Sequence, residues 1–287
     1  MGKAGAGVRF SVMSFNIRGS RFADGANVWP QRRTLNVATI LKYAPDIIGF
    51  QEVQRGNLVA YAGHLTAYDC QLGRAGVLRG EAEERVAIYW KRDRFERVDG
   101  GSFFLSETPD RWSRGWGANL TRVANWVRLR CRLTGHAILT LNTHLDHESH
   151  LARLEGSRLI VRRLDALARD DDGAIVVTGD FNDPAVAQPS LEQPAGRAHA
   201  IFTAAGFRDT FIEAGYADGP EVHTFHKFEG PARAPYGLRI DWVLVRDGAQ
   251  QVRTRALSIV QDAAPPLYPS DHYPVLAALE LAPRVAG

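Results

Sequence analysis

Polar and ionisable side chains follow several apolar, strand-like segments of this sequence at the point where each segment ends. They are Asn16, Gln51, Glu52, Asn142, Thr143, His144, Asp180 and Asn182, together with Asp241, Asp271 and His272 beside two later segments. A charge at the end of a buried strand is costly unless it is paired or binds a cation. Each residue alone is most simply a turn residue or a strand cap, but the recurrence of the pattern predicts one shared polar pocket.

The side chains of this set indicate chemistry with a hard cation. They offer mainly carboxylate and amide oxygens, with histidines and no cysteine, and such oxygen ligands favour Mg²⁺, with Mn²⁺ as a substitute, over Zn²⁺. The segment from His144 to His147 lacks a standard zinc spacing. The sequence has no G-x-S-x-G nucleophile elbow and no P-loop after a strand, which disfavours a serine hydrolase and a P-loop enzyme.

The elements that must position these residues are predicted from the hydrophobic pattern. Helices are expected over residues 30–43, ended by Pro45, and over 151–169, where leucines recur at helical spacing. Strands are expected over residues 8–15, 47–51, 86–90, 127–133, 137–143, 174–178, 239–245, 251–258 and 274–281. Many strands with few helices indicate a mixed α/β fold in which helices cover the outer faces of stacked sheets.

Three local patterns carry further expectations. Arginines alternate with apolar residues over 127–133, which predicts a strand with one solvated face. The acidic run 170–172 is interpreted as a solvated turn rather than as a metal cluster. Segments 102–119 and 185–237 are rich in Pro and Gly and are predicted to be long surface loops, which in compact domains are usually functional.

The whole chain is predicted to form a single domain over residues 1–287, with a core from about 8 to 281, because it has no internal repeat and no linker-like run. Its 35 Lys and Arg residues against 32 Asp and Glu give a formal net charge of +3. This bias is too small to indicate a nucleic-acid partner by itself.

The location is predicted from what the sequence lacks. It has no run approaching the ~18 apolar residues of a membrane helix and no apolar leader region before residue 8. We therefore expect a cytoplasmic protein in which Cys70 and Cys131 are buried thiols. A secreted protein whose leader was removed is the alternative.

The segments SFNIRG, IIGFQEV, LNTHLDH, VTGDFND, RIDWVLV and SDHYPV resemble, in order and spacing, the endonuclease/exonuclease/phosphatase superfamily. This superfamily includes DNase I-like nucleases, abasic-site endonucleases, inositol-phosphate phosphatases, sphingomyelinases and deadenylases. The resemblance covers residues from about 8 to 281, and GDFN with SDH and an upstream QE is its specific part. It implies an α/β fold: a four-layer αββα sandwich of two mainly antiparallel, DNase I-like sheets with the site at one end.

The resemblance also implies roles for the pocket residues. Glu52 matches the principal Mg²⁺ ligand, and Asn16 and Asp271 match residues of the metal environment. Asp180 matches the residue that orients and deprotonates the attacking water, and Asn182 the residue that holds this water and the phosphate in register.

Two histidines complete the catalytic set that the resemblance implies. His272 with Asp241 matches a His–Asp dyad, in which the carboxylate favours an imidazolium that stabilises charge on phosphoryl oxygens. His144 matches a second histidine of the DNase-like and phosphatase branches, where it contacts the scissile phosphate. Abasic-site endonucleases lack this histidine, so His144 disfavours that branch.

The predicted substrate-binding residues are Arg122, Asn142 and Trp116. The segment LSETP, with the tryptophans and Arg122 that follow it, resembles a bacterial subgroup of mostly uncharacterised members. Arg122 is either an extra phosphate contact or a surface arginine. Trp116 and its neighbour Trp112 either stack on a base or sugar or fix a long loop to the body.

Three further side chains near these motifs are assigned with less specific roles. Arg153 is interpreted as a solvated helix position, with the pocket lining as the alternative. His223 and His226 are interpreted as loop-packing residues, with substrate contact as the alternative.

Three functions follow from these residues and the resemblance. The leading prediction is a Mg²⁺-dependent phosphoesterase that cleaves a small or membrane-derived phosphomonoester or phosphodiester by in-line attack of water. The second is a DNA or RNA nuclease of the same superfamily, although no long basic run supports a groove for nucleic-acid phosphates. The third, a catalytically silent binding module, is disfavoured because every expected catalytic position holds a competent residue.

Overall fold

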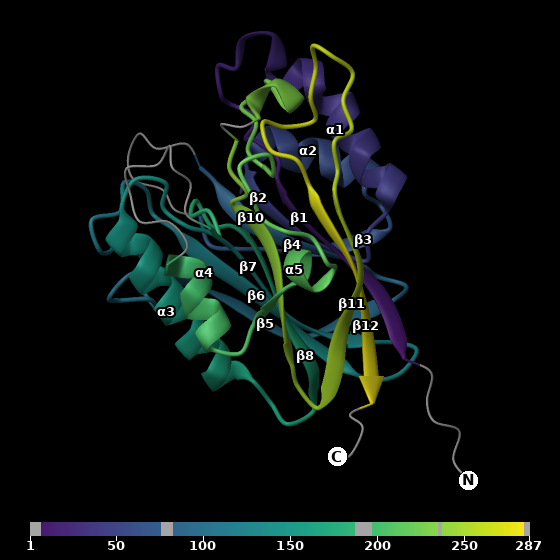
Figure 1. The fold of residues 1–287 in the computed structure, drawn as a ribbon. Helices are drawn as coiled ribbons and strands as arrows, with labels where there is room; N and C mark the ends of the chain where they lie inside the picture. Colours follow the sequence, from purple (N-terminus) through teal and green to yellow (C-terminus); the bar gives the residue numbers. More distant parts are fainter. Residues whose placement is uncertain (1–6, 76–82, 187–196, 235–236, 284–287) are drawn as a thin grey trace.

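Two six-stranded β-sheets face each other and carry helices on their outer sides (Figure 1). The structure is a computed structural model that describes residues 7–75, 83–186, 197–234 and 237–283. No helix among these residues combines the length and the apolar character that crossing a bilayer would require.

The first sheet has the strand order β11-β12-β1-β2-β4-β3 and the second the order β5-β6-β7-β8-β10-β9. The strands of the first sheet are β1 (Val8–Asn16), β2 (Ile47–Val53), β3 (Tyr68–Leu72), β4 (Arg85–Lys91), β11 (Gln250–Ile259) and β12 (Val275–Pro283). Those of the second are β5 (Phe95–Phe104), β6 (Val123–Cys131), β7 (Ala137–His144), β8 (Asp172–Asp180), β9 (Arg208–Asp209) and β10 (Asp241–Asp247). Among these strands the central pairs β1–β2 and β7–β8 are parallel and the other neighbours antiparallel.

The helices form the two outer layers. Helices α1 (Trp29–Tyr43) and α2 (Arg55–His64) pack on the first sheet, and α3 (His150–Leu167) and α4 (Arg197–Ala204) pack on the second (Figure 1). The remaining short helices are η1 (Gly25–Asn27), α5 (Thr210–Glu213) and η2 (Gly230–Arg233). The α/β sandwich of four layers, with two mainly antiparallel sheets, is therefore confirmed.

Strand β1 shows how the sequence fills both sides of a sheet. Its residues Phe10 and Val12 join the apolar cluster between the two sheets, whereas Met13 and Phe15 join the cluster beneath α1 and α2. Successive side chains of a strand point to opposite faces, so a strand covered on both faces needs a nearly continuous apolar run. This explains why the strand over 8–15 was predictable.

The first helix agrees with its sequence signals. Proline at its start and Ala44 with a φ of +40° at its end mark the limits of α1, since proline fits the first helical turn and a left-handed residue ends a helix. In the second outer layer, the Ser149 hydroxyl caps α3 by accepting a hydrogen bond from the backbone N–H of Ala152.

The predicted solvated face of β6 is wrong at Arg128, and the predicted solvated turn at 170–172 is wrong at Asp172. Both side chains are almost fully buried, and Arg128 Nε lies 2.7 Å from Asp172 Oδ1, with Nη2 3.0 Å from Oδ2. The two charges lie on strands of the same sheet, and neither local pattern reveals the other partner. A bidentate arginine–carboxylate pair satisfies both groups away from water.

Two other expectations also needed correction. Cys70 is exposed, while Cys131 is buried as predicted. Much of the segment 185–237 is ordered structure, because it holds α4, β9, α5 and η2 and buries Phe202 and Phe207 in the core. Residues 187–196 and 235–236 of this segment lie outside the described residues.

Replacing Asp172 by asparagine is expected to lower the free energy of unfolding by up to about 3–5 kcal/mol, because the change removes the buried carboxylate that pairs with Arg128 and leaves only the more distant, half-exposed Asp99 at 3.5 Å. Equilibrium unfolding in urea measures this loss. The double variant Arg128→Met/Asp172→Leu should lose less than Asp172→Asn, because it removes both charges together. Arg130→Met, at a half-exposed arginine of the same strand, is the control and should change stability by less than about 1 kcal/mol. A double variant less stable than the single one would contradict this account.

Candidate active site

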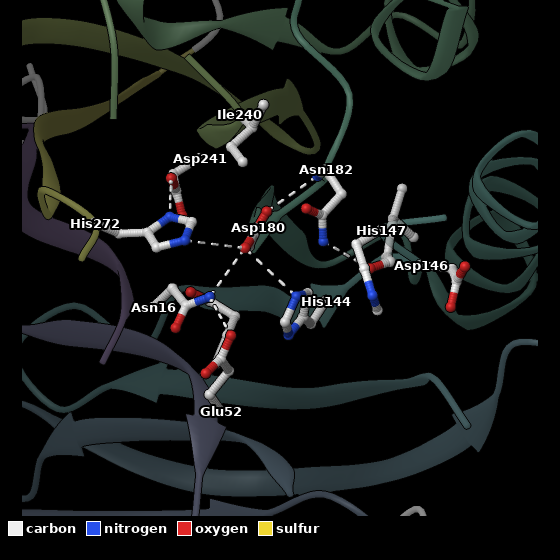
Figure 2. Close-up of polar contacts among 12 residues, drawn as sticks. Asn16, Glu52, His144, Asp146, His147, Asp180, Asn182, Ile240, Asp241 and His272 are labelled. Atoms are coloured by element: carbon white, nitrogen blue, oxygen red, sulfur yellow. Dashed lines mark hydrogen bonds and ion pairs between the residues drawn. The ribbon is translucent and has the colours of Figure 1, made fainter. Parts of the chain in front are cut away.

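The central parallel strands bring the predicted residues to one edge of the two sheets (Figure 2). In the first sheet Asn16 ends β1 and Glu52 lies one residue before the end of β2, while in the second His144 ends β7 and Asp180 ends β8. Asp241, the first residue of β10, pairs with Asp180 across the antiparallel ladder. Parallel neighbours end at the same edge of a sheet, so strands far apart in the sequence deliver their last polar residues to one place.

Asp180 lies at the centre of this group (Figure 2). Its Oδ2 accepts a hydrogen bond of 2.9 Å from the Asn16 side chain, and its Oδ1 accepts one of 3.0 Å from the backbone N–H of Asn182. The imidazole nitrogens of His144 and His272 lie 3.4 and 3.7 Å from Oδ2. Burial, reinforced by the nearby Asp241 charge, raises the pKa of Asp180 to about 7.

His272 and Asp241 form the predicted dyad. His272 Nδ1 donates to Asp241 Oδ2 over 2.8 Å, and both side chains are buried. Burial alone would lower the pKa of His272, but the charges of Asp241 and Asp180 outweigh it and raise the pKa to about 10. His272 is therefore an imidazolium at neutral pH, and its Nε2 faces Asp180.

His144, in contrast to His272, is neutral. Burial and then the positive charges of Arg122 and His272 hold its pKa well below the ordinary value. A neutral imidazole thus lies on one side of Asp180 and a cationic one on the other (Figure 2).

Glu52 reaches the site through an irregularity in β2. The register between β2 and β4 shifts between Phe50 and Val53, and Glu52 has a φ of +60°. A bulge of this kind redirects side chains: Gln51 points between the sheets to Asn142, over 2.7 Å, while Glu52 joins the lining of the cavity. Its Oε1 accepts from the Asn16 side chain over 3.0 Å, and its Oε2 accepts from a loop N–H.

Acidic side chains gather around Glu52. Asp271 and Glu84 also line the cavity, and burial together with the Glu52 charge raises the pKa of both, that of Glu84 to about 7. Arg18 pairs with two of these carboxylates, with guanidinium nitrogens 4.0 Å from Glu52 Oε2 and 3.7 Å from Asp271 Oδ2. Arg122 near Glu84 and Arg32 near Asp271 add positive charge, and the pKa of both carboxyl groups nevertheless stays raised.

These residues fit a hard divalent cation. Glu52, Asp271 and Asn16 offer the oxygen donors that Mg²⁺ and Mn²⁺ prefer, and a bound cation would offset the burial and the Glu52 charge that raise the pKa of Asp271. Asp180, Asp241 and His272 form a second set, in which one ligand atom of each lies within 4.8 Å of the others. In that set His272 Nδ1 is already engaged by Asp241.

A cavity of about 500 Å³ opens in front of these groups. Its lining includes the predicted residues Glu52, Arg122, His144, Asp180, Asn182, Asp271 and His272. Arg122 is buried and is therefore not a surface arginine. Its Nη2 lies 3.2 Å from the Nδ1 of His147, which also lines the cavity. The volume falls within the range of ordinary small-molecule sites.

Two predicted substrate-binding residues lie elsewhere. Asn142 is fully buried between the sheets, where its side-chain amide donates to the backbone carbonyls of Phe50 and Ala87. Trp116 packs against the apolar cluster of the second sheet, has a φ of +54° and is not among the residues that line the cavity. Asn142 therefore contacts the opposite sheet, and the position of Trp116 favours the alternative in which it fixes its loop to the body of the protein.

Among the remaining assignments, Arg153 differs from its interpretation and the two histidines agree with theirs. Arg153 is buried rather than solvated and donates to the backbone carbonyl of Asp146 over 3.0 Å. His223 and His226 are buried loop residues, as interpreted, and His226 stacks on Tyr273 with ring centroids 4.0 Å apart. Burial lowers the pKa of His226 to about 3, so it stays neutral.

Arg32 on α1 supports the site and was missed from the sequence. Its buried guanidinium donates to the backbone carbonyls of Ile17, Gly19 and Pro269 over 2.8, 3.2 and 3.0 Å. These carbonyls belong to the segments that follow Asn16 and precede Asp271. The helical pattern placed Arg32 on α1, but nothing local indicates that it turns inward.

Thr224 is the second supporting residue that the sequence did not reveal. Its hydroxyl oxygen accepts hydrogen bonds from the backbone N–H groups of Ile240 and Asp241, both over 3.1 Å, and its carbonyl accepts one from Tyr273 over 2.7 Å. One residue therefore fixes the strand start that carries Asp241 and the segment that carries His272. Its position in HTFHKF, between the two histidines, was the only available signal.

Comparison with known proteins identifies the family that has this fold and this set of polar groups. The model of the Endonuclease/Exonuclease/phosphatase family matches residues 13–272, and the chain belongs to this family. Its members include phosphatases and nucleases, so the chain is a hydrolase-family protein with phosphatase and nuclease relatives.

Particular relatives are similar over nearly the whole chain. The mannosyl-6-phosphatase of Bacteroides thetaiotaomicron is 29% identical with a TM-score of 0.80, and 94% of this chain and 99% of that chain are covered. Another Bacteroides thetaiotaomicron protein of the family is 28% identical with a TM-score of 0.79, over 96% and 98% of the two chains.

Nocturnin of Drosophila melanogaster is 28% identical over 181 residues, which is 56% of this chain and 25% of the relative. Nocturnin of Xenopus laevis is 24% identical over 60% of this chain and 47% of the relative. The aligned part of this chain thus spans between a quarter and about half of these curated relatives.

The charge states of the two histidines can be measured directly. In an NMR titration of the metal-free protein, His272 should stay protonated until the pH approaches about 10, and His144 should stay neutral throughout the neutral range. Asp241→Asn should move the pKa of His272 down, because it removes the largest charge that favours the imidazolium. His136, far from this group in the β6–β7 turn, is the internal control. A wild-type His272 that titrates near its ordinary value would contradict this assignment.

Proposed function

We propose that this chain is a divalent-metal-dependent phosphoesterase that hydrolyses a small phosphate ester by in-line attack of water. The observation that carries the proposal is the position of Asp180. Its carboxylate lies between the neutral His144 and the cationic His272, at the edge of the cavity that also holds Glu52 and Asp271. A base, a cation and an acidic ligand set in one cavity are the parts that phosphoryl transfer to water requires.

Asp180 is the proposed base. Donation from Asn16 and from the Asn182 backbone to its two oxygens favours the carboxylate form against the effect of burial. A pKa near neutrality suits a group that must accept a proton from water and later release it. Asn182 is itself held by a hydrogen bond of 3.0 Å from its side-chain amide to the carbonyl of Leu145, which keeps it beside Asp180.

The histidines have different proposed tasks. Imidazolium His272 presents a positive charge and an Nε2–H to the phosphoryl oxygens, and Asp241, which accepts the Nδ1–H, stabilises the protonated ring. Neutral His144 offers a hydrogen bond without a full charge on the opposite side of the cavity. Arg122 lies in the same lining and gives a further charge-assisted contact to an anion.

A bound Mg²⁺ or Mn²⁺ would act as a Lewis acid that neutralises charge on the phosphate. Glu52, Asp271 and Asn16 are the residues proposed to hold it. Arg18 lies beside both carboxylates, so a phosphate there would meet Arg18 and the bound cation, and the imidazolium of His272 as well.

A small substrate agrees better with the observations than a nucleic acid does. The cavity of about 500 Å³ matches a small-molecule site, and the chain has a formal net charge of only +3. The mannosyl-6-phosphatase relative, at 29% identity over 94% of this chain, supports a phosphorylated small molecule as substrate. A nuclease activity is the alternative that the family allows.

Asp180→Asn is expected to lower kcat by at least about 10²–10⁴-fold, since general-base catalysis contributes about this much. Hydrolysis of p-nitrophenyl phosphate with added Mg²⁺ or Mn²⁺ measures the change. Asp170→Asn, at an exposed aspartate beyond α3, is the matched control and should retain wild-type turnover. Wild-type turnover in Asp180→Asn would exclude Asp180 as the base.

Removal of divalent metal by EDTA should abolish hydrolysis, and Mg²⁺ or Mn²⁺ should restore it. Glu52→Gln should weaken Mn²⁺ binding to the substrate-free protein, measured by calorimetry, because it removes one negative ligand. Glu83→Gln, at an exposed glutamate outside the cavity, should bind Mn²⁺ as the wild type does. Activity that survives complete chelation would remove the metal from the proposal.

A further inference from the structure

A side recess of about 230 Å³ continues from the active-site cavity. The residues common to the recess and the cavity are Phe22, Glu52, Glu84, Leu120, Arg122 and His144. The residues that line the recess alone are Arg74, Arg85, Val86, Thr121 and Val123. The recess therefore begins at the groups proposed to hold the phosphate and leads away from Asp180, which does not line it.

The recess has an apolar wall that is rigidly packed. Val86 at the start of β4 and Val123 at the start of β6 form a separate buried cluster with Phe104 at the end of β5. Phe22 and Leu120 add apolar surface at the junction with the cavity. This wall offers the C–H face of a ring an apolar surface to pack against.

Arg74 gives the far side of the recess a fixed cation. Its guanidinium lies over the Phe104 ring, 5.4 Å from the centroid, and Nη1 donates to the backbone carbonyl of Asp110 over 2.9 Å. Its backbone N–H donates to the Ser102 hydroxyl. Among the described residues no carboxylate forms an ion pair with Arg74, and its side chain lines the recess, where its guanidinium can donate to a ligand.

Glu84 gives the near side of the recess an acceptor. It is partly exposed, precedes β4 and lines both the recess and the main cavity. A donor and an acceptor on two sides of an apolar wall can bind the hydroxyl groups of a ring while one face of the ring packs on the wall. A base-stacked strand of nucleic acid needs an open groove, which a recess smaller than the usual 300–1,000 Å³ of ligand pockets does not offer.

We propose that this recess binds the alcohol part of the substrate, and that this alcohol is a single polyhydroxylated ring such as a hexose. The inference rests on the proposed phosphoesterase function and makes it more specific. The phosphate lies in the main cavity at Arg122, His144 and His272, and the ring extends past Glu84 toward Arg74. Arg74 and Glu84 are specificity residues in this arrangement, because neither contacts the reacting atoms.

Two variants test the recess without touching the main cavity. Arg74→Gln removes the charged donors, and Thr121→Phe fills the space, because both residues line the recess alone. With a panel of aldohexose 1- and 6-phosphates and added Mg²⁺, each variant should lower kcat/KM for the best substrate by about 10-fold or more, mainly through KM. Arg74→Gln loses a charge-assisted contact, and Thr121→Phe occupies the space of the ring.

The controls separate the recess from the reaction. Inhibition by inorganic phosphate, which needs only the main cavity, should keep the same Ki in both variants. Hydrolysis of p-nitrophenyl phosphate should fall much less in Arg74→Gln than hydrolysis of the sugar phosphate does, since its ring carries no sugar hydroxyls. Arg33→Gln, at an exposed arginine on α1, should behave as the wild type. If Thr121→Phe does not fold, Arg74→Gln still decides the question, because Arg74 is exposed.

The outcomes distinguish the two proposals. A wild-type protein that hydrolyses no phosphate ester with added metal would overturn the proposed function itself. Hydrolysis of p-nitrophenyl phosphate with no turnover of any sugar phosphate would overturn the recess proposal alone. So would an unchanged kcat/KM for the sugar phosphate in Arg74→Gln, an equal loss for both substrates in that variant, or preferential cleavage of a short oligonucleotide.

Discussion

A pair of hydrogen bonds from one asparagine joins the two sheets at the site. Asn16 at the end of β1 donates to Glu52 of its own sheet over 3.0 Å and to Asp180 of the opposite sheet over 2.9 Å. Beneath it, Gln51 donates to Asn142 across the same interface over 2.7 Å. Buried polar groups are tolerated only when they are hydrogen-bonded. The amides therefore allow two apolar sheets to end in a charged site, because each of these carboxylates meets a donor from the protein.

The two sheets approach each other so closely at Gly49 that this position has no room for a side chain. A Cβ atom on Gly49 would lie 2.0 Å from the Thr178 hydroxyl and 2.8 Å from the side-chain oxygen of Asn142. Glycine at this point lets the amides of one sheet reach the other. At the ends of these strands, the charges of Asp241 and Asp180 keep His272 cationic, whereas burial and the nearby positive charges keep His144 neutral on the other side of the same aspartate.

The sequence predicted the strands and the polar side chains that gather at their ends because both depend on local patterns. Apolar runs mark strands that are buried on both faces, and a polar residue directly after such a run marks the edge where the strand ends. The same reasoning fails for Asn142, which lies two residues inside its strand and faces the other sheet. It fails also for Arg128 with Asp172 and for Arg32, because their partners are distant in the sequence. Resemblance supplied roles for residues at strand ends, whereas contacts across the fold required the structure.

Backbone strain near the site follows from these same contacts. Arg18, Glu52 and Asn182 all have a positive φ, of 51°, 60° and 49°. Asparagine tolerates this region well, but arginine and glutamate adopt it at a cost and need contacts that hold them there. Arg18 is held by its N–H to the Asn16 side chain and by Arg32, which binds its carbonyl. Glu52 is held by Asn16 and by the N–H of Gly19. These three residues all line the cavity, and the buried guanidinium on α1 together with the asparagine that joins the sheets holds Arg18 and Glu52 in this conformation.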